Sequence, residues 1–427
     1  MKIVPELRFP EFESLGRWND KPISKLGETV NGLSGKKGAD FGSGKPYVQY
    51  KQVFDKSYID FSECGKVDIA DDENQNTVQK GDILFTTSSE TPNEVGFASV
   101  IIKQPEEDTY LNSFCFILRP FDIEEVNPSF SRYLFHSPIY RNSVSTIAQG
   151  STRFNLSKGA FLKLKVPLPK HQEQQKIASC LTSLDELIAA HSDKLQALQD
   201  HKIGLMQQLF LQDGQTVPQY RFPEFEKEGD WEIRSVESNI KLMSGIALKS
   251  SELSNDNSGT PILRGINITE GQIRHSKEMD KFYLGDTTEI AKYLIMENDI
   301  VIGMDGSKVG KNVALISKQD AGAILIQRVA RIRAKNSVTE YLYQHFVSLA
   351  FRKYVDIVNT SSGIPHISAK QIRDFEIGFP PKIQEQQKIA SCLSAVDELI
   401  TAQAEKIKQL QYHKKGMMQG LFPKNES

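Results

Sequence analysis

Two long stretches of the chain carry hydrophobic residues at alternating intervals of four and three. This spacing places them on one narrow stripe of a helix, as in the seam of a coiled coil. Each stretch predicts a helix of about 39 residues, roughly 58 Å long at 1.5 Å per residue. The seam residues are Ile177, Leu181, Leu184, Ile188, Leu195, Leu198, Leu205 and Leu209 in the first stretch and Ile389, Leu393, Val396, Ile400, Ile407, Leu410, Met417 and Leu421 in the second.

The two stretches belong to a repeat that covers nearly the whole chain. The sequence QQKIASCL starts at Gln174 and again at Gln386, and RFPEF starts at Arg8 and again at Arg221. A tryptophan follows each RFPEF. A repeat of this length is a whole domain, far longer than the roughly 20 to 50 residues of a solenoid repeat. The second half of the chain is therefore interpreted as a divergent copy of the first.

Outside the two stretches the pattern changes to short strands bounded by turn residues. GDILFTTSS at Gly81 matches NDIVIGMDG at Asn298, and a further apolar run follows each of them, at residues 98–102 and 313–316. Each block closes with a strand run that ends in proline, KLKVPLP in the first and FEIGFPP in the second. These runs predict a mixed β-sheet in each block.

One helix is expected inside each block. In the first block, Asn127 and Pro128 provide a helix cap and a first turn. In the second block the pattern predicts a single helix from Tyr341 to Tyr354. The fold class that combines these strands and helices is α+β.

The predicted organisation is globular domain, helix, globular domain, helix, with bounds at residues 1–170, 171–210, 211–382 and 383–427. We expect the two helices to form an intramolecular antiparallel coiled coil, which sets Ile177 against Leu421. Lys202 and Lys414, which interrupt the two seams at equivalent places, would then lie opposite apolar residues. Their stems would pack while their ammonium groups reach water.

Composition is that of an ordinary globular protein, with 427 residues, 39% hydrophobic and 25% charged. No apolar run approaches the ~20 residues of a membrane span, and the first residues do not resemble a signal peptide. We therefore expect a cytoplasmic protein with no membrane association. The four cysteines form no CxxC motif, and Cys180 and Cys392 are the same position of the repeat, so we interpret them as reduced packing residues. A net charge of −2 means that any basic surface must be local.

The chain resembles the DNA-specificity subunit of type I restriction-modification enzymes. The features that carry the resemblance are the repeated EQQKIASCL segments at Glu173 and Glu385, the proline-ended strands before them and the variable domains. The resemblance covers nearly the whole chain. It implies two target-recognition domains that each read one half of a bipartite, asymmetric site in double-stranded DNA. It further implies two methyltransferase subunits docked on the coiled coil and separate motor-nuclease subunits. S-adenosylmethionine and ATP would bind those partners, and this chain would have no catalytic residue, cofactor or metal.

Two alternatives remain. The fragments ADFGSG at Ala39 and NPSF at Asn127 mimic the cofactor turn and the catalytic motif of a stand-alone adenine DNA methyltransferase. However, ADFGSG precedes a strand-like run rather than a helix, which is the wrong context for a cofactor turn. The second alternative is a non-DNA scaffold in which the coiled coil links two binding modules. Salt-dependent binding to duplex DNA separates this alternative from DNA recognition.

Three polar loops that recur at equivalent places are the candidate DNA contacts, at residues 35–51, 86–93 and 149–158 in the first domain and 244–264, 304–312 and 360–373 in the second. Any one of these residues, taken alone, is more simply part of a solvated loop. Lysines and serines would mainly hold phosphates, whereas Gln49, Asn93, Arg153 and Arg264 have donor geometry for base edges. The candidates of the first domain are Lys36, Lys37, Lys45, Tyr47, Gln49, Asn93, Ser151, Thr152 and Arg153. Those of the second domain are Lys249, Arg264, Ser307, Lys308, Lys311, Ser361, Ser362, His366, Lys370 and Arg373.

Overall fold

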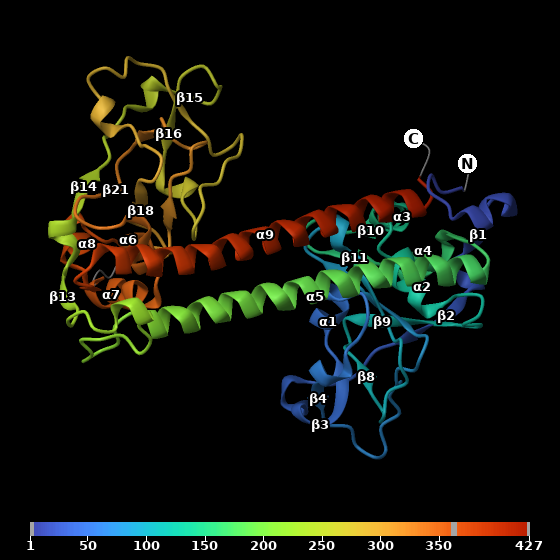
Figure 1. Cartoon of the computed structure of the whole chain (residues 1–427). Coiled ribbons are helices and arrows are strands. Elements are labelled where there is room, and N and C mark those ends of the chain that lie inside the picture. Colours follow the sequence, from blue (N-terminus) through green and yellow to red (C-terminus); the bar gives the residue numbers. More distant parts are fainter. Residues whose placement is uncertain (1–3, 360–364, 425–427) are drawn as a thin grey trace. The chain divides into compact units, whose positions relative to one another are not determined.

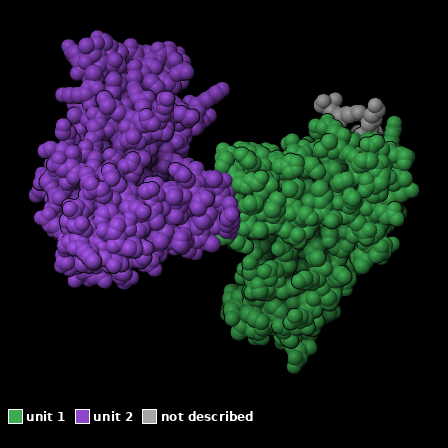
Figure 2. Space-filling view, in the orientation of Figure 1, with its two compact units in different colours: residues 1–193, 405–427 green, residues 194–404 purple. Residues whose placement is uncertain are grey.

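The computed structural model describes residues 4–359 and 365–424. The chain divides into two compact units, residues 1–193 with 405–427 and residues 194–404 (Figure 2). Each unit combines one globular block with part of both long helices, α5 (His171–Leu209) and α9 (Ile383–Leu421) (Figure 1). Both helices have 39 residues, as their heptad patterns predict.

A four-stranded antiparallel sheet forms the centre of each unit, and its strand order is the same in both. The order is β2-β9-β5-β7 in the first unit and β14-β21-β18-β19 in the second. The strands are β2 (Gly27–Asn31), β9 (Cys115–Pro120), β5 (Ile83–Thr86), β7 (Ala98–Val100), β14 (Ile240–Ser244), β21 (Val329–Ala334), β18 (Ile300–Gly303) and β19 (Val313–Leu315). The strand runs predicted at Gly81 and Asn298, and the runs that follow them, are thus confirmed.

Smaller sheets flank the central sheet of the first unit. One of them is two-stranded and pairs β1 with β12. The other two are three-stranded, with the strand orders β4-β3-β8 and β10-β11-β6. Their strands are β1 (Asn19–Pro22), β12 (Lys165–Leu168), β3 (Phe41–Val48), β4 (Gly65–Val67), β8 (Tyr110–Leu111), β6 (Ser88–Ser89), β10 (Ala148–Gln149) and β11 (Phe154–Leu156). The helices are α1 (Tyr50–Asp55), α2 (Pro128–Leu134), α3 (Pro138–Thr146) and α4 (Lys158–Lys163).

The second unit has the corresponding elements with local changes. Strand β13 pairs with β22, and a further sheet has the order β15-β17-β16-β20. These strands are β13 (Glu232–Ser235), β22 (Glu376–Phe379), β15 (Leu253–Ser254), β17 (Phe282–Tyr283), β16 (Thr260–Leu263) and β20 (Ile324–Leu325). The helices are α6 (Thr339–Phe346), α7 (Leu349–Val358) and α8 (Ala369–Asp374). Strands β12 and β22 are the two predicted proline-ended runs.

The prediction of a single helix in each block is wrong. In the second unit the segment from Tyr341 to Tyr354 is split between α6 and α7, because Ser348 caps α7 and its side chain accepts a hydrogen bond from the Phe351 amide. In the first unit α3 likewise follows α2 after a break at Ser137. The predicted cap at Asn127 is present, since its side-chain oxygen accepts a 3.0 Å hydrogen bond from the Phe130 amide.

The core of each unit contains the start of one long helix and the end of the other. Ile177 and Leu181 share a buried cluster with Leu421 in the first unit. In the second unit, Leu209 shares a buried cluster with Ile389. These clusters confirm the antiparallel orientation of α5 and α9, which Figure 1 shows as the green and red helices. Every seam residue in both helices is buried or half-buried, whereas Leu187, Ile203, Leu399 and Tyr412 beside the seam are exposed.

Both seam lysines form an ion pair with an aspartate of the other long helix, which the prediction did not include. Lys202 Nζ donates to Asp397 Oδ1 at 2.6 Å, and the lysine side chain is only 14% exposed. Lys414 makes the equivalent ion pair with Asp185 in the first unit. Each aspartate also binds its own domain, because Asp185 accepts from Tyr133 and Asp397 accepts from Gln344 in the helix that follows the central sheet. These polar pairs fix the helix register within each unit.

The repeated RFPEF and EQQKIASCL sequences meet in space. In the second unit the Arg221 guanidinium donates to both carboxylate oxygens of Glu385, at 2.8 and 2.9 Å, and Trp231 Nε1 donates to Oε1 at 3.3 Å. Arg8, Trp18 and Glu173 make the same three contacts in the first unit. The following glutamines, Gln174 and Gln386, each accept a hydrogen bond from the backbone that precedes the domain helix. The two repeated motifs therefore join each domain to its coiled-coil helix.

Candidate nucleic-acid interface

Two of the three recurring polar loops of each domain meet the residue before the long central strand at one place, at the end of the central strands β5 and β18. In the first domain the Thr87 amide donates to Phe114 O at 2.9 Å, and the Leu156 amide donates to Thr87 O at 2.8 Å. In the second domain the Met304 amide donates to Arg328 O at 2.9 Å, and the Ile367 amide donates to Met304 O at 2.8 Å. The same backbone arrangement is thus built twice.

We call these places the first junction (residues 87–89, 114 and 154–156) and the second junction (residues 304–306, 328 and 365–367). In the first junction Ser88 pairs with Asn155, and in the second Asp305 pairs with His366 at the equivalent bridge. The backbones correspond, but the side chains at corresponding positions differ. Different chemistry on one scaffold is what two domains with different targets need.

A hollow of about 460 Å³ adjoins the first junction. Its lining includes residues from all three predicted loops, Tyr50, Ser88, Thr152 and Arg153, together with the acidic residues Glu90 and Glu94. Such a mixture of aromatic surface, donors and acceptors can contact base edges.

The predicted loop at residues 35–51 in the first domain is mostly ordered secondary structure. It contains a short 3-10 helix (Gly38–Asp40), strand β3 and the start of α1. Lys36 is only 8% exposed and pairs with Glu73, and the exposed Lys45 lies 3.6 Å from Glu107. Tyr47 packs on Phe41 with ring centroids 5.1 Å apart. Lys36 and Lys45 are therefore partly neutralised by carboxylates.

Lys37 and Lys249 lie at equivalent positions, directly before short 3-10 helices at Gly38–Asp40 and Ser250–Glu252. Each is exposed, and each backbone amide donates to an acidic side chain three residues later, at 2.6 Å to Asp40 and 2.9 Å to Glu252. Their ammonium groups have no ion-pair partner among the described residues. They remain suitable for phosphate contacts in both domains.

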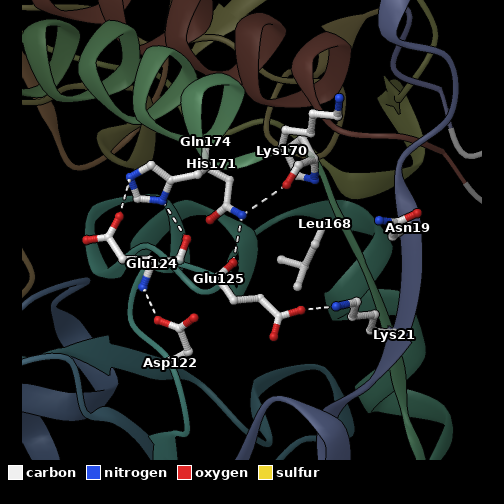
Figure 3. Close-up of a pocket in the computed structure, with 10 residues that line it drawn as sticks. Asn19, Lys21, Asp122, Glu124, Glu125, Leu168, Lys170, His171 and Gln174 are labelled. Atoms are coloured by element: carbon white, nitrogen blue, oxygen red, sulfur yellow. Dashed lines mark hydrogen bonds and ion pairs between the residues drawn. The ribbon is translucent and has the colours of Figure 1, made fainter.

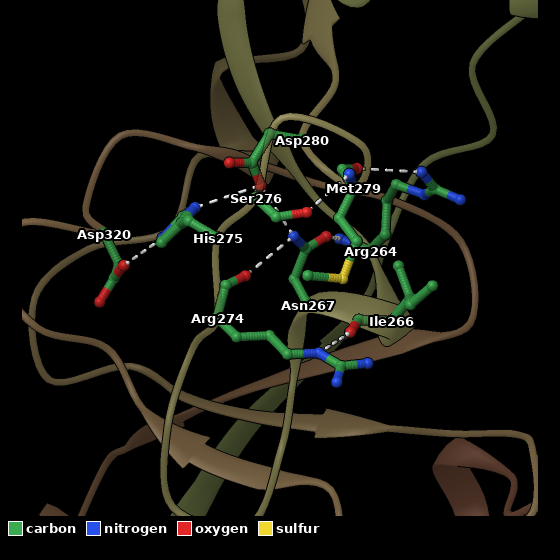
Figure 4. A network of polar contacts seen from close by, with 9 residues as sticks. All are labelled: Arg264, Ile266, Asn267, Arg274, His275, Ser276, Met279, Asp280 and Asp320. Carbon is green, nitrogen blue, oxygen red and sulfur yellow. Dashed lines mark hydrogen bonds and ion pairs between the residues drawn. The ribbon is translucent and has the colours of Figure 1, made fainter. Parts of the chain in front are cut away.

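Gln49 and Arg264 form a second equivalent pair. Each follows the inner strand of a parallel pair, β3 with β8 or β16 with β20, and each caps the helical turn that follows. The Arg264 guanidinium donates to Met279 O at 3.2 Å, so it is held against the segment that Figure 4 shows. In the same network His275 lies between Asp280 and Asp320, at 3.2 and 2.9 Å. The hydrogen bond with Asp320 contributes most to raising the pKa of His275, and Asp280 raises it further.

The other first-domain candidates are exposed and lie near the first junction. Asn93 lies in the 3-10 helix Pro92–Glu94, and its carbonyl accepts from Arg141 at 2.6 Å. Ser151 and Thr152 form the turn between β10 and β11. The guanidinium of Arg153 lies 5.6 Å from the ring centroid of Phe114, whose side chain is 54% exposed.

The other second-domain candidates divide into two groups. Ser307, Lys308 and Lys311 are exposed in the turn after the second junction, and His366 is exposed in the junction itself. Lys370 and Arg373 lie on helix α8 rather than in a loop, and Arg373 is 3.7 Å from Glu237, in the 3-10 helix that precedes β14. Ser361 and Ser362 lie outside the described residues.

Sequence reasoning missed two residues of the junctions, Phe114 and Arg328. Each lies directly before the long strand of the central sheet, at β9 and β21. Aligning FCFILRP with RVARIRA would have shown that one repeat has an aromatic residue where the other has an arginine. Arg328 Nη1 donates to Asp305 Oδ2 at 2.7 Å.

A second hollow, of about 360 Å³, lies at the start of α5 and is structural in character. Its polar groups pair with one another, as Figure 3 shows for His171 with Glu124 and for Gln174 with the Glu125 carbonyl. Its three carboxylates, Asp122, Glu124 and Glu125, lie among the cationic side chains of Lys21 and Lys170.

The two methyltransferase-like fragments are structural elements. The sequence ADFGSG passes from a 3-10 helix into strand β3 and does not begin a helix that could face a cofactor. Asn127 uses its side-chain oxygen to cap α2. Both observations agree with the sequence argument against a stand-alone methyltransferase.

Comparison with known proteins identifies the class of protein that this fold defines. The family model "Type I restriction modification DNA specificity domain" matches residues 16–200 and 228–412, once for each repeat. The chain therefore belongs to the family of type I restriction-modification specificity subunits, and its function is DNA recognition.

Individual relatives agree with this assignment. The MjaVIII specificity subunit of Methanocaldococcus jannaschii is 23% identical, and the match covers 98% of this chain and 96% of the relative. The EcoKI specificity subunit of Escherichia coli is 24% identical over 72% of this chain and 66% of the relative. The crystal structure of the S subunit from M. genitalium has the same fold, with a TM-score of 0.61, 15% identity and coverage of 99% and 100%. Within the described residues, no helix is long and apolar enough to cross a membrane.

Proposed function

We propose that the two domains each read one half of a bipartite, asymmetric DNA site and that the coiled coil sets the distance between the halves. The observation that carries this proposal is the repeated junction, in which equivalent backbone positions present different side chains. Ser88, Phe114 and Asn155 in the first domain correspond to Asp305, Arg328 and His366 in the second. Two different sets of donors and acceptors select two different base sequences.

A role without catalysis of its own fits the same site. The first junction presents hydroxyls, one amide and aromatic rings, and the second presents the Arg328–Asp305 ion pair and a histidine. The methyltransferase-like fragments serve as a strand and a helix cap. We propose that methylation and cleavage belong to partner subunits, which would bind S-adenosylmethionine and ATP. The cytoplasmic location expected from the sequence remains part of this proposal, because the target DNA lies there.

The partner surface is proposed on the outer face of the repeated EQQKIASCL helices. Gln175, Lys176 and Leu187 are exposed on α5, and Gln387, Lys388 and Leu399 are exposed at the equivalent places on α9. Since the junctions diverge while this surface is repeated, we assign it to two copies of one methyltransferase subunit, with motor-nuclease subunits completing the complex. Mass measurement of the purified complex should give two methyltransferase subunits per chain. Saturation at one copy would contradict the proposal.

The division of labour between the domains is tested by domain exchange. The chain would be co-expressed with its methyltransferase partner, and methylated positions in the host DNA would be mapped. Replacing residues 1–170 with the corresponding domain of another specificity subunit should change one half of the methylated sequence and leave the other half intact. A simultaneous change in both halves would show that the domains do not read separately.

A further inference from the structure

The second junction contains an exposed ion pair that no other part of the fold explains. Arg328 is 66% exposed, and its guanidinium donates through Nη1 to Asp305, which is 23% exposed. Among the described residues, Asp305 is the only hydrogen-bonding partner of the Arg328 guanidinium. An ion pair this exposed contributes little to stability. Its position therefore points to a role other than stabilising the fold.

The backbone of Arg328 is in a conformation that its side chain does not favour. Its φ is +67°, and Asn298 is the only other non-glycine residue with a positive φ in the described part of the chain. Asparagine tolerates the left-handed region, whereas arginine seldom adopts it. The conformation is held by neighbours, because the Met304 amide donates to Arg328 O and the Gly245 amide donates to Val329 O. Strain retained in this way is characteristic of functional positions.

Asp305 holds one edge of the guanidinium and leaves the rest of the fork free. A guanidinium presents five donors in a rigid plane, so an arginine fixed by one carboxylate can still make two parallel hydrogen bonds elsewhere. The base edge that accepts two such bonds is that of guanine, through O6 and N7 in the major groove. Because Asp305 fixes the side chain before binding, less conformational entropy is lost on contact.

The first junction places a guanidinium in the corresponding region by a different route. Phe114 occupies the position of Arg328, and Arg153 from the β10–β11 turn lies over its ring. Ser88 replaces Asp305, so that junction has no carboxylate at the equivalent bridge. The two domains thus share an arginine at the junction but orient it with an aromatic ring in one case and a carboxylate in the other.

We propose that Arg328 reads a guanine in the half-site of the second domain and that Asp305 is its positioning residue. This inference rests on the proposed function, because it specifies one base within the site that the second domain recognises. It assigns a specificity-determining role to a residue outside the predicted loops.

The test uses Arg328→Gly, because glycine adopts a positive φ without strain and the variant should fold. The full chain in complex with its methyltransferase partner would select binding sites from a pool of duplexes with a randomised central segment. The wild-type complex should require guanine at one position of the second half-site. Arg328→Gly should lower the preference for that guanine by about 5- to 140-fold, as expected for loss of one bidentate contact. All other positions should keep their preferences.

Arg352→Ala provides a control, since Arg352 on helix α7 donates to Glu270 at 2.8 Å and belongs to neither junction. It should leave every preference unchanged. Retention of all guanine preferences by Arg328→Gly would overturn the inference. So would uniformly weaker binding to all sequences with a salt dependence reduced by one phosphate contact, because Arg328 would then hold a phosphate and not a base. Failure of the wild-type complex to select any sequence would instead overturn the proposed function.

Discussion

At the scale of single residues, His345 shows how one substitution between the repeats changes the physical behaviour of a unit. It occupies the position that Leu134 holds in the first unit, since each carbonyl accepts a 2.6 Å hydrogen bond from the hydroxyl of a following serine. The imidazole stacks on Phe210 with ring centroids 3.9 Å apart. Burial lowers the pKa of His345 to about 3.

The lowered pKa gives a definite sign to the pH dependence. In the unfolded chain His345 binds a proton below its usual pKa of about 6.5, whereas in the folded state it stays neutral until about pH 3. Above pH 6.5 the histidine is neutral in both states, so it does not make the free energy of unfolding depend on pH. As the pH falls from 6.5 towards 3, the unfolded state gains the proton and stability is lost. At pH 5 the loss is about 2 kcal/mol.

We expect His345→Leu, which introduces the residue of the first repeat, to remove this loss. Urea unfolding at pH 7 and pH 5 can be followed by the fluorescence of Trp231 alone in a Trp18→Phe background, because the chain has two tryptophans and one lies in each unit. Between pH 7 and pH 5 the free energy of unfolding of the second unit should fall in both proteins. The fall should be about 2 kcal/mol smaller in the His345→Leu variant than in the protein that keeps His345.

The control is the first unit, which contains its own buried histidine. Burial lowers the pKa of His136 to about 4, and its Nε2 lies 2.7 Å from the Ala98 carbonyl. Followed by Trp18 in a Trp231→Phe background, the acid sensitivity of the first unit should be the same with and without His345→Leu. An unchanged acid sensitivity of the second unit would show that His345 is not the group responsible.

Residue roles were predictable where they depend on neighbours in sequence. The seam of the coiled coil follows from a heptad pattern, and the cap at Asn127 follows from the Asn-Pro pair. The roles of Asp185 and Asp397 were not predictable in this way, because the lysine that each one binds lies on the other long helix. Arg328 was missed for the same reason, since its partner and its strained backbone arise from tertiary contacts.

At the scale of elements, one buried ion pair fastens the segment before each domain to the start of its long helix. Arg221 and Glu385 are 5% and 1% exposed, and Trp231 donates to the same carboxylate. Removing one partner of a buried pair leaves an uncompensated charge, which typically costs about 3–5 kcal/mol.

We expect Glu385→Gln to lower the free energy of unfolding of the second unit by about 3–5 kcal/mol, measured by urea unfolding with Trp231 as the probe. Glu398→Gln is the control, because Glu398 is exposed on the same helix and its replacement should change stability by less than about 0.5 kcal/mol. Equal losses in the two variants would mean that the buried pair has no special role.

Element boundaries show where sequence patterns lose information. Strands β5 and β18 were predicted because continuous apolar runs lie between turn residues. The break between α6 and α7 was missed because the apolar pattern continues across Ser348, and only the serine hydroxyl capping α7 marks the new start. Strand β3 was recognised only in its second half, because Gly42 and Gly44 in its first half suggested a loop. Its pairing with β4 and β8 holds it extended.

At the scale of the whole molecule, the repeat predicted two related domains, and the heptad patterns predicted two long helices, for which an antiparallel orientation was expected. The bounds of the compact units were not predictable, because each unit takes part of both helices and its limits, Asp193 and Ala404, fall within continuous heptad patterns. Which base each domain reads is also absent from the pattern. It depends on side chains at the junctions, which the two copies do not share.

The proposal that the coiled coil sets the distance between the half-sites makes its sharpest prediction at these unit limits. One heptad inserted after Asp193 and one after Ala404 would lengthen both helices where the two units divide, and would keep the apolar seam in phase. Duplicating residues 194–200 and 405–411 would supply native seam residues to both insertions. The added length is roughly 10 Å, which corresponds to at most about three base pairs of duplex.

We expect the lengthened chain, co-expressed with its methyltransferase partner, to methylate sites whose unread spacer is longer by up to about three base pairs. Both half-site sequences should stay the same, because the ion pairs of Lys202 with Asp397 and of Lys414 with Asp185 remain within their own units. A single insertion in α5 alone is the control, and it should abolish site-specific methylation, since the two helices then lose their common register. Retained activity with an unchanged spacer in the doubly extended chain would show that a partner subunit, rather than this coiled coil, sets the distance between the half-sites.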